Sequence, residues 1–259
     1  MAKLKVSRVN ECIWNICEPN DQGVDYVDAY LIVGSKRAVL IDALMRGGGL
    51  CEIVRSVTDL PVDILLTHGH GDHAGADLLP MIKSGMDAYI AKEDMPMLKR
   101  LMDATGLAES DFKLLSDGMK FDLGGITLET VALPGHTPGS IMMLDRENGR
   151  LFSGDTIGSG NIWLQLPGCT PLHEYLEALD GKILPMLSEY SDLIIYPGHK
   201  NQAPGQLGLS YVHDLRDITE KAVKGEVKGE PYGTGSRFAS GLVLSHGQMR
   251  GFVYNPDNI

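Results

Sequence analysis

The chain has 259 residues, of which 43% are hydrophobic and 22% charged, an ordinary composition for a globular protein. This composition excludes a largely disordered chain, and the length suits one substantial domain. The formal net charge is −11, and the longest basic clusters are doublets such as Lys36-Arg37. A nucleic-acid binder usually carries a basic face, so we expect no nucleic-acid partner.

The N-terminal segment and the cysteines indicate a cellular compartment. Residues 1–8 lack the apolar run of a signal peptide, and no apolar run is long enough to cross a membrane. The four cysteines, Cys12, Cys17, Cys51 and Cys169, have no zinc-ribbon or Cys-x-x-Cys spacing. We therefore expect a cytoplasmic protein with reduced thiols and no membrane partner. The role of Cys169 stays open, because it lies near the expected pocket.

Strands and helices alternate along the chain. Apolar, β-branched runs predict strands over 24–33 and 37–41, separated by the turn signal Gly34-Ser35. Further strands are expected over 62–67, 87–90, 126–133, 140–144, 150–153 and 193–196, with a hairpin-like pair over 241–254. Helices are expected over 50–57, 76–83, 93–102, 172–187 and 209–223. Without a repeat or linker, the chain is predicted to be a single domain, 1–259, with a C-terminal elaboration after about residue 200.

A dense histidine cluster follows the strand expected over 62–67. The stretch His68-Gly69-His70-Gly71-Asp72-His73 holds three of the chain's eight histidines and one carboxylate. Its glycines let the backbone bend so that the side chains can converge. Imidazole and carboxylate together suit zinc, iron or manganese. The cluster therefore predicts a metal site.

Three further segments place a possible ligand directly after an apolar strand. These are Pro134-Gly135-His136, Gly154-Asp155 and Pro197-Gly198-His199. Ligand sites of αβ folds commonly lie at the ends of strands. If the strand ends share one edge of a sheet, these segments and the histidine cluster meet there.

The ordered set His68-x-His70-x-Asp72-His73, His136, Asp155, His199 resembles the metallo-β-lactamase superfamily, and especially its glyoxalase II-like hydrolases. The resemblance extends from about residue 24 to residue 199. It implies an α/β (α+β) fold, an αββα four-layer sandwich with two sheets face to face and helices outside. It also implies that one metal is bound by His68, His70 and His136, and a second by Asp72, His73 and His199, with Asp155 bridging them. The stretch Val39-Leu40-Ile41-Asp42 looks like the family's first motif, whose aspartate supports the metal loop.

This likeness implies two divalent metal ions as cofactors, with zinc as the first choice and iron or manganese as alternatives. A dication lowers the pKa of bound water from 15.7 to about 7, so hydroxide becomes available at neutral pH. Asp72 and Asp155 are the predicted catalytic residues. Histidine ligands usually need a partner that fixes their tautomer. Asp42, Thr67, Thr137 and Thr156 are candidates, although such residues are also common in ordinary turns.

Other polar residues have two interpretations each. His173, His213 and His246 match no ligand position and are expected to be surface or packing residues. Arg46, Lys200, Tyr232 and Arg237 could orient a carboxylate or phosphate, with solvated surface charge preferred for Arg237. A mostly apolar loop after Asp155 either borders the pocket, as the resemblance implies, or packs in the core; its residues are Trp163, Leu164, Leu166 and Cys169.

The predicted function is hydrolysis of an ester-like bond, a thioester or lactone of a small-molecule substrate, by metal-bound hydroxide. The alternatives are a mononuclear iron persulfide dioxygenase and a metal-dependent phosphodiesterase or nuclease. The dioxygenase ranks lower because 157–161 departs from the Gly-Cys-Gly-Arg-like stretch of those proteins, and the nuclease because of the acidic charge. Asp155 and the missing signal peptide argue against a β-lactamase. His70 argues against a flavodiiron-type reductase. The intact ligand set argues against a non-catalytic pseudo-hydrolase. The substrate, the native metal and the oligomeric state stay open.

Overall fold

The computed structural model describes residues 3–203, 205–233, 241–246 and 249–259 of the chain. The chain forms two compact units. Unit 1 comprises Met1–Val131 and Met143–Asn148, and unit 2 comprises Ala132–Met142 and Gly149–Ile259.

The main sheet of unit 1 has seven strands in the order β1-β2-β3-β4-β5-β6-β7. The strands are β1 (Lys5–Arg8), β2 (Ile13–Pro19), β3 (Asp25–Val33), β4 (Ala38–Ile41), β5 (Val62–Leu65), β6 (Asp87–Ala91) and β7 (Phe112–Leu115). Pairing is antiparallel from β1 to β4 and parallel from β4 to β7. The parallel strands β4 and β5 are buried along their whole length, and apart from Asp63, which pairs with Arg37, their residues are apolar. Their C-terminal ends lead into Asp42 and Thr67.

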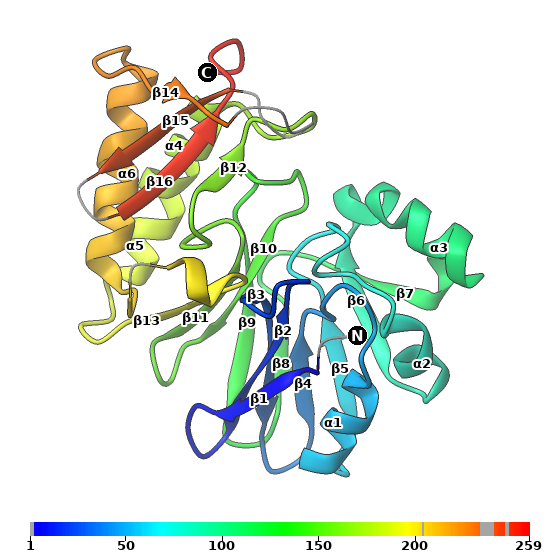
Figure 1. Cartoon of the computed structure of the whole chain (residues 1–259). Coiled ribbons are helices and arrows are strands. Elements are labelled where there is room, and N and C mark those ends of the chain that lie inside the picture. The colour runs from blue at the N-terminus through cyan, green and yellow to red at the C-terminus, as the bar shows by residue number, and fades with distance from the viewer. Residues whose placement is uncertain (1–2, 204, 234–240, 247–248) are drawn as a thin grey trace. The chain divides into compact units, whose positions relative to one another are not determined.

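Helices α1 (Leu50–Val57), α2 (Leu78–Lys83) and α3 (Lys99–Thr105) accompany this sheet (Figure 1). Leu50 and Val54 of α1 and Leu78 and Met81 of α2 belong to the same buried cluster as the apolar side chains of β2 to β6. The core of unit 1 therefore lies between these helices and the sheet, directly beside the loops that leave β4 and β5.

Some predictions for unit 1 need correction. The helix expected over 93–102 begins as a 3₁₀ turn, Lys92–Leu98, before α3. Pro96 lies inside this turn and has no N–H for an α-helical hydrogen bond, which explains the tighter start. Strands β1, β2 and β7 were not predicted, nor was β8 (Lys120–Asp122), which pairs antiparallel with β9 (Thr127–Ala132). The strand predicted over 140–144 is β10 (Ile141–Asp145), which is buried throughout.

Unit 2 contains a parallel pair and a four-stranded sheet. Strand β11 (Arg150–Gly154) pairs with β13 (Ile194–Pro197), so that Gly154 lies opposite Pro197. The other sheet has the order β12-β16-β15-β14, formed by β12 (Ile162–Leu164), β14 (Glu230–Pro231), β15 (Leu242–His246) and β16 (Met249–Tyr254). The predicted hairpin-like pair is confirmed as β15 and β16, with residues 247–248 outside the described part. The apolar loop expected after Asp155 is in part a strand, β12.

The helices of unit 2 follow the predicted bounds. The helix expected over 172–187 consists of α4 (Leu172–Ala178), a π-helical turn (Leu179–Ile183) and α5 (Leu184–Leu187). Pro185 has no N–H to donate to the carbonyl of Gly181, which accounts for the wider turn. Helix α6 (Leu209–Val223) matches its prediction and buries one face, including Val212 and Leu215. Among the described residues, no helix is long and apolar enough to cross a membrane.

Candidate metal centre

The histidine cluster follows β5 and is supported by Asp42, the residue after β4. Asp42 has a φ of 64° and is buried. Its Oδ1 accepts a hydrogen bond from the backbone N–H of Thr67 at 2.8 Å, and its Oδ2 lies 2.8 Å from Nδ1 of His73. The backbone N–H of Ala43 also donates to the carbonyl of His73, at 2.7 Å. The two loops are therefore joined by both side-chain and backbone hydrogen bonds.

These contacts fix the tautomers of two histidines. A carboxylate only accepts hydrogen bonds, so His73 donates from Nδ1 and carries its lone pair on Nε2. The Thr67 hydroxyl is 2.9 Å from Asp42 Oδ2 and 3.0 Å from Nδ1 of His68. Because its one proton goes to Asp42, the hydroxyl accepts from His68, whose lone pair is then also on Nε2. The predicted supporting roles of Asp42 and Thr67 thus have a structural basis.

Gly69 brings the loop against a buried carboxylate that the sequence did not single out. The N–H of Gly69 donates to Oδ2 of Asp94 at 2.9 Å, and Asp94 is fully buried. A Cβ at Gly69 would lie 2.7 Å from Cβ of Met97 and 2.9 Å from the carbonyl oxygen of Asp94. Glycine is therefore required here for close packing. Asp94 lies within a stretch with helical spacing, which hid its role.

A second missed residue is Tyr26 on β3. Its hydroxyl donates to Oδ2 of Asp72 at 3.2 Å. The two side chains are 46 positions apart in the sequence, so no local pattern indicates this contact.

The unit 2 residues of the predicted set lie at the ends of their strands. Nδ1 of His136 lies 2.8 Å from the carbonyl oxygen of Trp163, so His136 donates there and its lone pair is on Nε2. The hydroxyl of Ser159 accepts from the backbone N–H of His199 at 3.1 Å and donates to the carbonyl of Gly154 at 2.8 Å. This links His199 to the turn that carries Asp155.

Asp155 lies beside both of these histidines. Its Oδ2 is 3.8 Å from Nε2 of His136 and 3.2 Å from Nε2 of His199. Two ligand atoms on one tetrahedral metal, with bonds of about 2.0–2.2 Å, lie about 3.3–3.6 Å apart. The Asp155 contacts are close to that separation.

Cys169 supports the His136 turn. Its buried thiol donates to the carbonyl of His136 at 3.1 Å and lies 3.5 Å from the carbonyl of Trp163. Burial raises the pKa of the Cys169 thiol to about 11. Cys169 is thus a neutral hydrogen-bond donor to the backbone, in keeping with the packing interpretation of this stretch.

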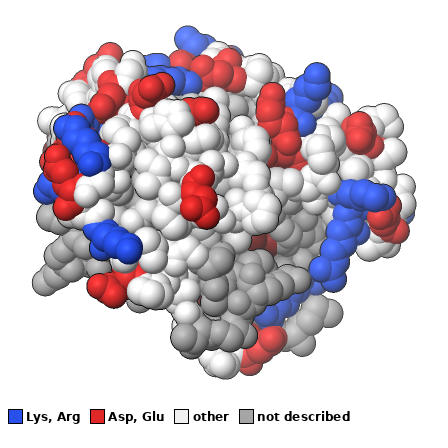
Figure 2. Space-filling model, turned by 90° about the horizontal axis from the view of Figure 1, so that it is seen from above, with Lys and Arg blue, Asp and Glu red and all other residues white. Residues whose placement is uncertain are grey.

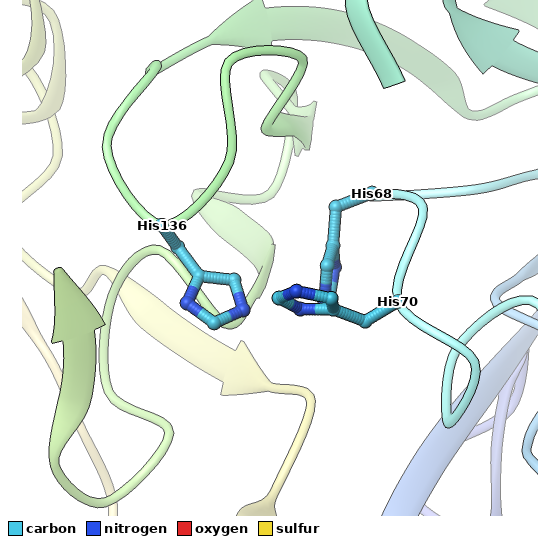
Figure 3. Close-up of side chains that lie close together, drawn as sticks. All are labelled: His68, His70 and His136. Carbon is cyan, nitrogen blue, oxygen red and sulfur yellow. The ribbon is translucent and has the colours of Figure 1, made fainter. Parts of the chain in front are cut away.

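Three groups of side chains could each hold a metal ion. The groups are His68, His70 and His136; His68, His73 and Asp155; and Asp72, His73 and His199. Within each group the ligand atoms lie within 4.8 Å of one another. Figure 3 shows the rings of His68, His70 and His136 turned toward one another. Neutral imidazoles and carboxylates at this spacing fit a zinc-type ion.

The strands that precede these residues do not all belong to one sheet, as the sequence had suggested. Strand β5 lies in the seven-stranded sheet, whereas β9, β11 and β13 belong to a five-stranded sheet with the order β13-β11-β10-β9-β8. The prediction of a shared edge holds for Asp155 and His199, because β11 and β13 pair in parallel. It is wrong for the histidine cluster.

Several other candidates have different partners. Thr137 contacts Ser140, and Thr156 donates to the carbonyl of Leu133. Arg46 forms ion pairs with Glu18 and Asp21. His173 contacts the carbonyl of Ile259, and His213 is exposed on α6. Lys200 is exposed, and the ring of Tyr232 lies edge-on to Trp163. Arg237 and the side chain of His246 lie outside the described residues.

A family model described as the metallo-β-lactamase superfamily matches residues 22–199, which is more than half of the chain. The chain belongs to the metallo-β-lactamase superfamily. The predicted resemblance and fold class are thereby confirmed. Members of this metallo-hydrolase superfamily are generally metal-dependent hydrolases, and the histidine and aspartate groups fit a metal site.

Individual relatives are distant. Hydroxyacylglutathione hydrolase GloC of Haemophilus influenzae is 30% identical over 63% of this chain and 80% of its own length. Persulfide dioxygenase ETHE1 of Bos taurus is 29% identical over 72% of this chain and 67% of its own length. The chain spans as little as 41% of another curated relative, the Beta-lactamase-like protein 2 homolog of Caenorhabditis elegans. Among solved structures, DIM-1 metallo-β-lactamase has a TM-score of 0.67 at 17% identity, covering 85% of this chain and 98% of that one, which shows the shared fold.

Proposed function

We propose that this chain is a dinuclear metal-dependent hydrolase that cleaves a thioester or lactone. The observation that carries the proposal is the set of three overlapping donor groups, in which His68 and His73 each belong to two groups. A single metal uses only three or four protein ligands, whereas these groups together offer seven. The surplus of donors favours two ions over one.

We assign His68, His70 and His136 to one metal, Asp72, His73 and His199 to the other, and Asp155 to a bridging position. The bridge is supported by Oδ2 of Asp155, which lies near one histidine assigned to each metal, His136 and His199. Zinc is our first choice, with iron or manganese as alternatives, because nitrogen and oxygen donors accept all three.

When bound, two such dications make hydroxide available at neutral pH and polarise the carbonyl of the substrate. The chain's own residues prepare this centre. Asp42 holds the proton of His73 on Nδ1, and Thr67 holds that of His68 on Nδ1. The carbonyl of Trp163 holds the proton of His136 on Nδ1. All three rings are thereby fixed with Nε2 as the donor atom before any metal arrives, so less ordering is needed on binding.

Three observations favour an acyl substrate over a phosphodiester. The net charge of −11 repels polyanions and slows their association. Acidic and basic side chains are interspersed on the face shown in Figure 2, which does not favour a phosphate backbone as a ligand. On strand β12 (Ile162–Leu164), which follows Asp155, the half-buried side chain is Trp163, whose apolar ring suits an acyl chain or ring. The match to a hydroxyacylglutathione hydrolase supports the same class.

A persulfide dioxygenase is the second candidate, because the match to such a protein covers 72% of this chain. The Gly-Cys-Gly-Arg-like stretch expected of such dioxygenases would fall at residues 157–161. There the chain instead has Ser159, whose hydroxyl joins Gly154 to His199. This arrangement leaves the dioxygenase as the lower-ranked proposal.

The test compares kcat/KM for a thioester, a lactone, a β-lactam and bis(p-nitrophenyl) phosphate at matched metal loading. We expect the thioester or the lactone to be the best substrate. Oxygen consumption with glutathione persulfide is measured on iron-loaded protein as a separate arm. Faster phosphodiester turnover than acyl turnover, or persulfide-dependent oxygen uptake without hydrolysis, would overturn the proposal.

A further inference from the structure

Asp72 has a hydrogen-bond donor on a distant strand. Tyr26 is the second residue of β3, and its hydroxyl donates to Oδ2 of Asp72 at 3.2 Å. Both side chains are half-buried. A hydrogen bond to a charged acceptor in such surroundings is stronger than one in water, because solvent competes less for the two groups.

Asp72 lies in the loop between an open position and a tightly held one. The preceding Gly71 is exposed, and a Cβ built on it would meet no atom within 4 Å. The next residue, His73, is by contrast buried and held by Asp42. The hydroxyl of Tyr26 supplies Asp72 with a contact from outside this loop.

The carboxylate of Asp72 has two oxygens that could face a metal. Donation from Tyr26 to Oδ2 restricts rotation about the Cβ–Cγ bond and holds the carboxyl plane in one orientation. This parallels the three histidines whose Nδ1 contacts fix their rings, at His68, His73 and His136. Ligand orientation by such partners commonly changes metal affinity by about 10–100-fold.

We propose that Tyr26 is a positioning residue that orients Asp72 and so sets the affinity of the metal held by Asp72, His73 and His199. The inference rests on the proposed dinuclear site. Tyr26 acts through Asp72, so its removal affects this metal and leaves the ion at His68, His70 and His136 bound as before.

The test replaces Tyr26 with phenylalanine, which keeps the ring and removes only the hydroxyl. The two stepwise dissociation constants for Zn²⁺ are measured by competition with a chromophoric chelator. We expect one constant to rise by about tenfold or more, while the other changes much less. Tyr89→Phe is the matched control, because Tyr89 is a half-buried tyrosine of the same sheet whose ring packs against Phe121. It should leave both constants unchanged.

Two further measurements separate positioning from a general structural role. The melting temperature of the metal-free Tyr26→Phe protein should stay close to that of the metal-free wild type. In an Asp72→Ala background, adding Tyr26→Phe should change neither constant further, since the hydroxyl has lost the group through which it acts.

The outcomes are distinct. A wild type that binds fewer than two ions overturns the dinuclear proposal and the inference with it. A wild type that binds two ions, with Tyr26→Phe unchanged or weakened equally at both, overturns the inference alone. An undiminished effect of Tyr26→Phe in the Asp72→Ala background also overturns it.

Discussion

Nδ1 of His73 lies 2.8 Å from Oδ2 of Asp42, and both side chains are buried. Asp42 holds this position with a left-handed backbone, φ 64°, a conformation that costs most residues about 1–2 kcal/mol but that aspartate and asparagine tolerate better. The same carboxylate accepts from the backbone and the hydroxyl of Thr67. One side chain thus organises the loop and two of its histidines.

Asp42→Asn should therefore weaken metal binding by about 10–100-fold. Asparagine preserves the volume and the backbone preference, but its NH₂ group would face a donor, either His73 or Thr67. Metal affinity is measured by chelator competition. The control is Asp63→Asn, another buried carboxylate of the same sheet, which pairs with Arg37 instead. Wild-type affinity in Asp42→Asn would show that this carboxylate does not support the centre.

Asp155→Ala should lower kcat by more than about tenfold and reduce metal content, since a ligand matters at least as much as its supporting partners. The exposed Asp180→Ala serves as the control, because Asp180 belongs to the same unit and pairs with Arg216 on the surface. Turnover and elemental content are measured on the same preparations. An Asp155→Ala protein with full activity and full metal content would remove Asp155 from the bridging position.

Gly135→Ala should destabilise the protein by about 1–3 kcal/mol, because a Cβ there would lie 2.5 Å from Cδ2 of the buried ring of Tyr175. Gly181→Ala is the matched substitution in the same unit: a Cβ there meets nothing within 4 Å, and alanine is the better helix former by about 1 kcal/mol. Urea unfolding of both variants measures the difference. Equal stabilities would contradict the packing described at the His136 turn.

The four thiols should react in two classes. Cys12 and Cys51 are half-buried and should be alkylated in the native protein, whereas Cys17 and Cys169 are buried and should react only after unfolding. Burial raises the pKa of Cys17 to about 12, so almost none of it is thiolate at pH 8. Mass spectrometry after alkylation at pH 8 distinguishes the classes. Rapid native labelling of Cys169 would contradict its packing role.

Local patterns in the sequence were sufficient for part of this structure. The helices Leu50–Val57 and Leu209–Val223 match their predictions because apolar residues recur at helical spacing along one face. The ligand set could be proposed because its residues lie in short, unusual stretches after apolar strands. Strand β1 was not predicted, because all four of its residues are exposed and it is defined by pairing with β2.

The supporting residues divide in the same way. Asp42 was predicted because Val39-Leu40-Ile41-Asp42 looks like the family's first motif, and Thr67 is the residue directly before the cluster. Tyr26 and Asp94 were not predicted. Tyr26 contacts Asp72, which is 46 positions away in the sequence, and Asp94 accepts a hydrogen bond from the backbone N–H of Gly69. The sharing of one sheet edge by all the ligand-bearing strands was also wrong. The sequence of a single strand does not indicate which other strands it pairs with.

The most direct test of this account is the metal stoichiometry. The protein is stripped with a chelator, reloaded with excess Zn²⁺, freed of unbound metal by gel filtration and analysed for zinc per chain. We predict two zinc ions per chain, and fewer when Asp155 is replaced by alanine. Saturation at one zinc ion per chain, or no zinc binding at all, would contradict the dinuclear centre.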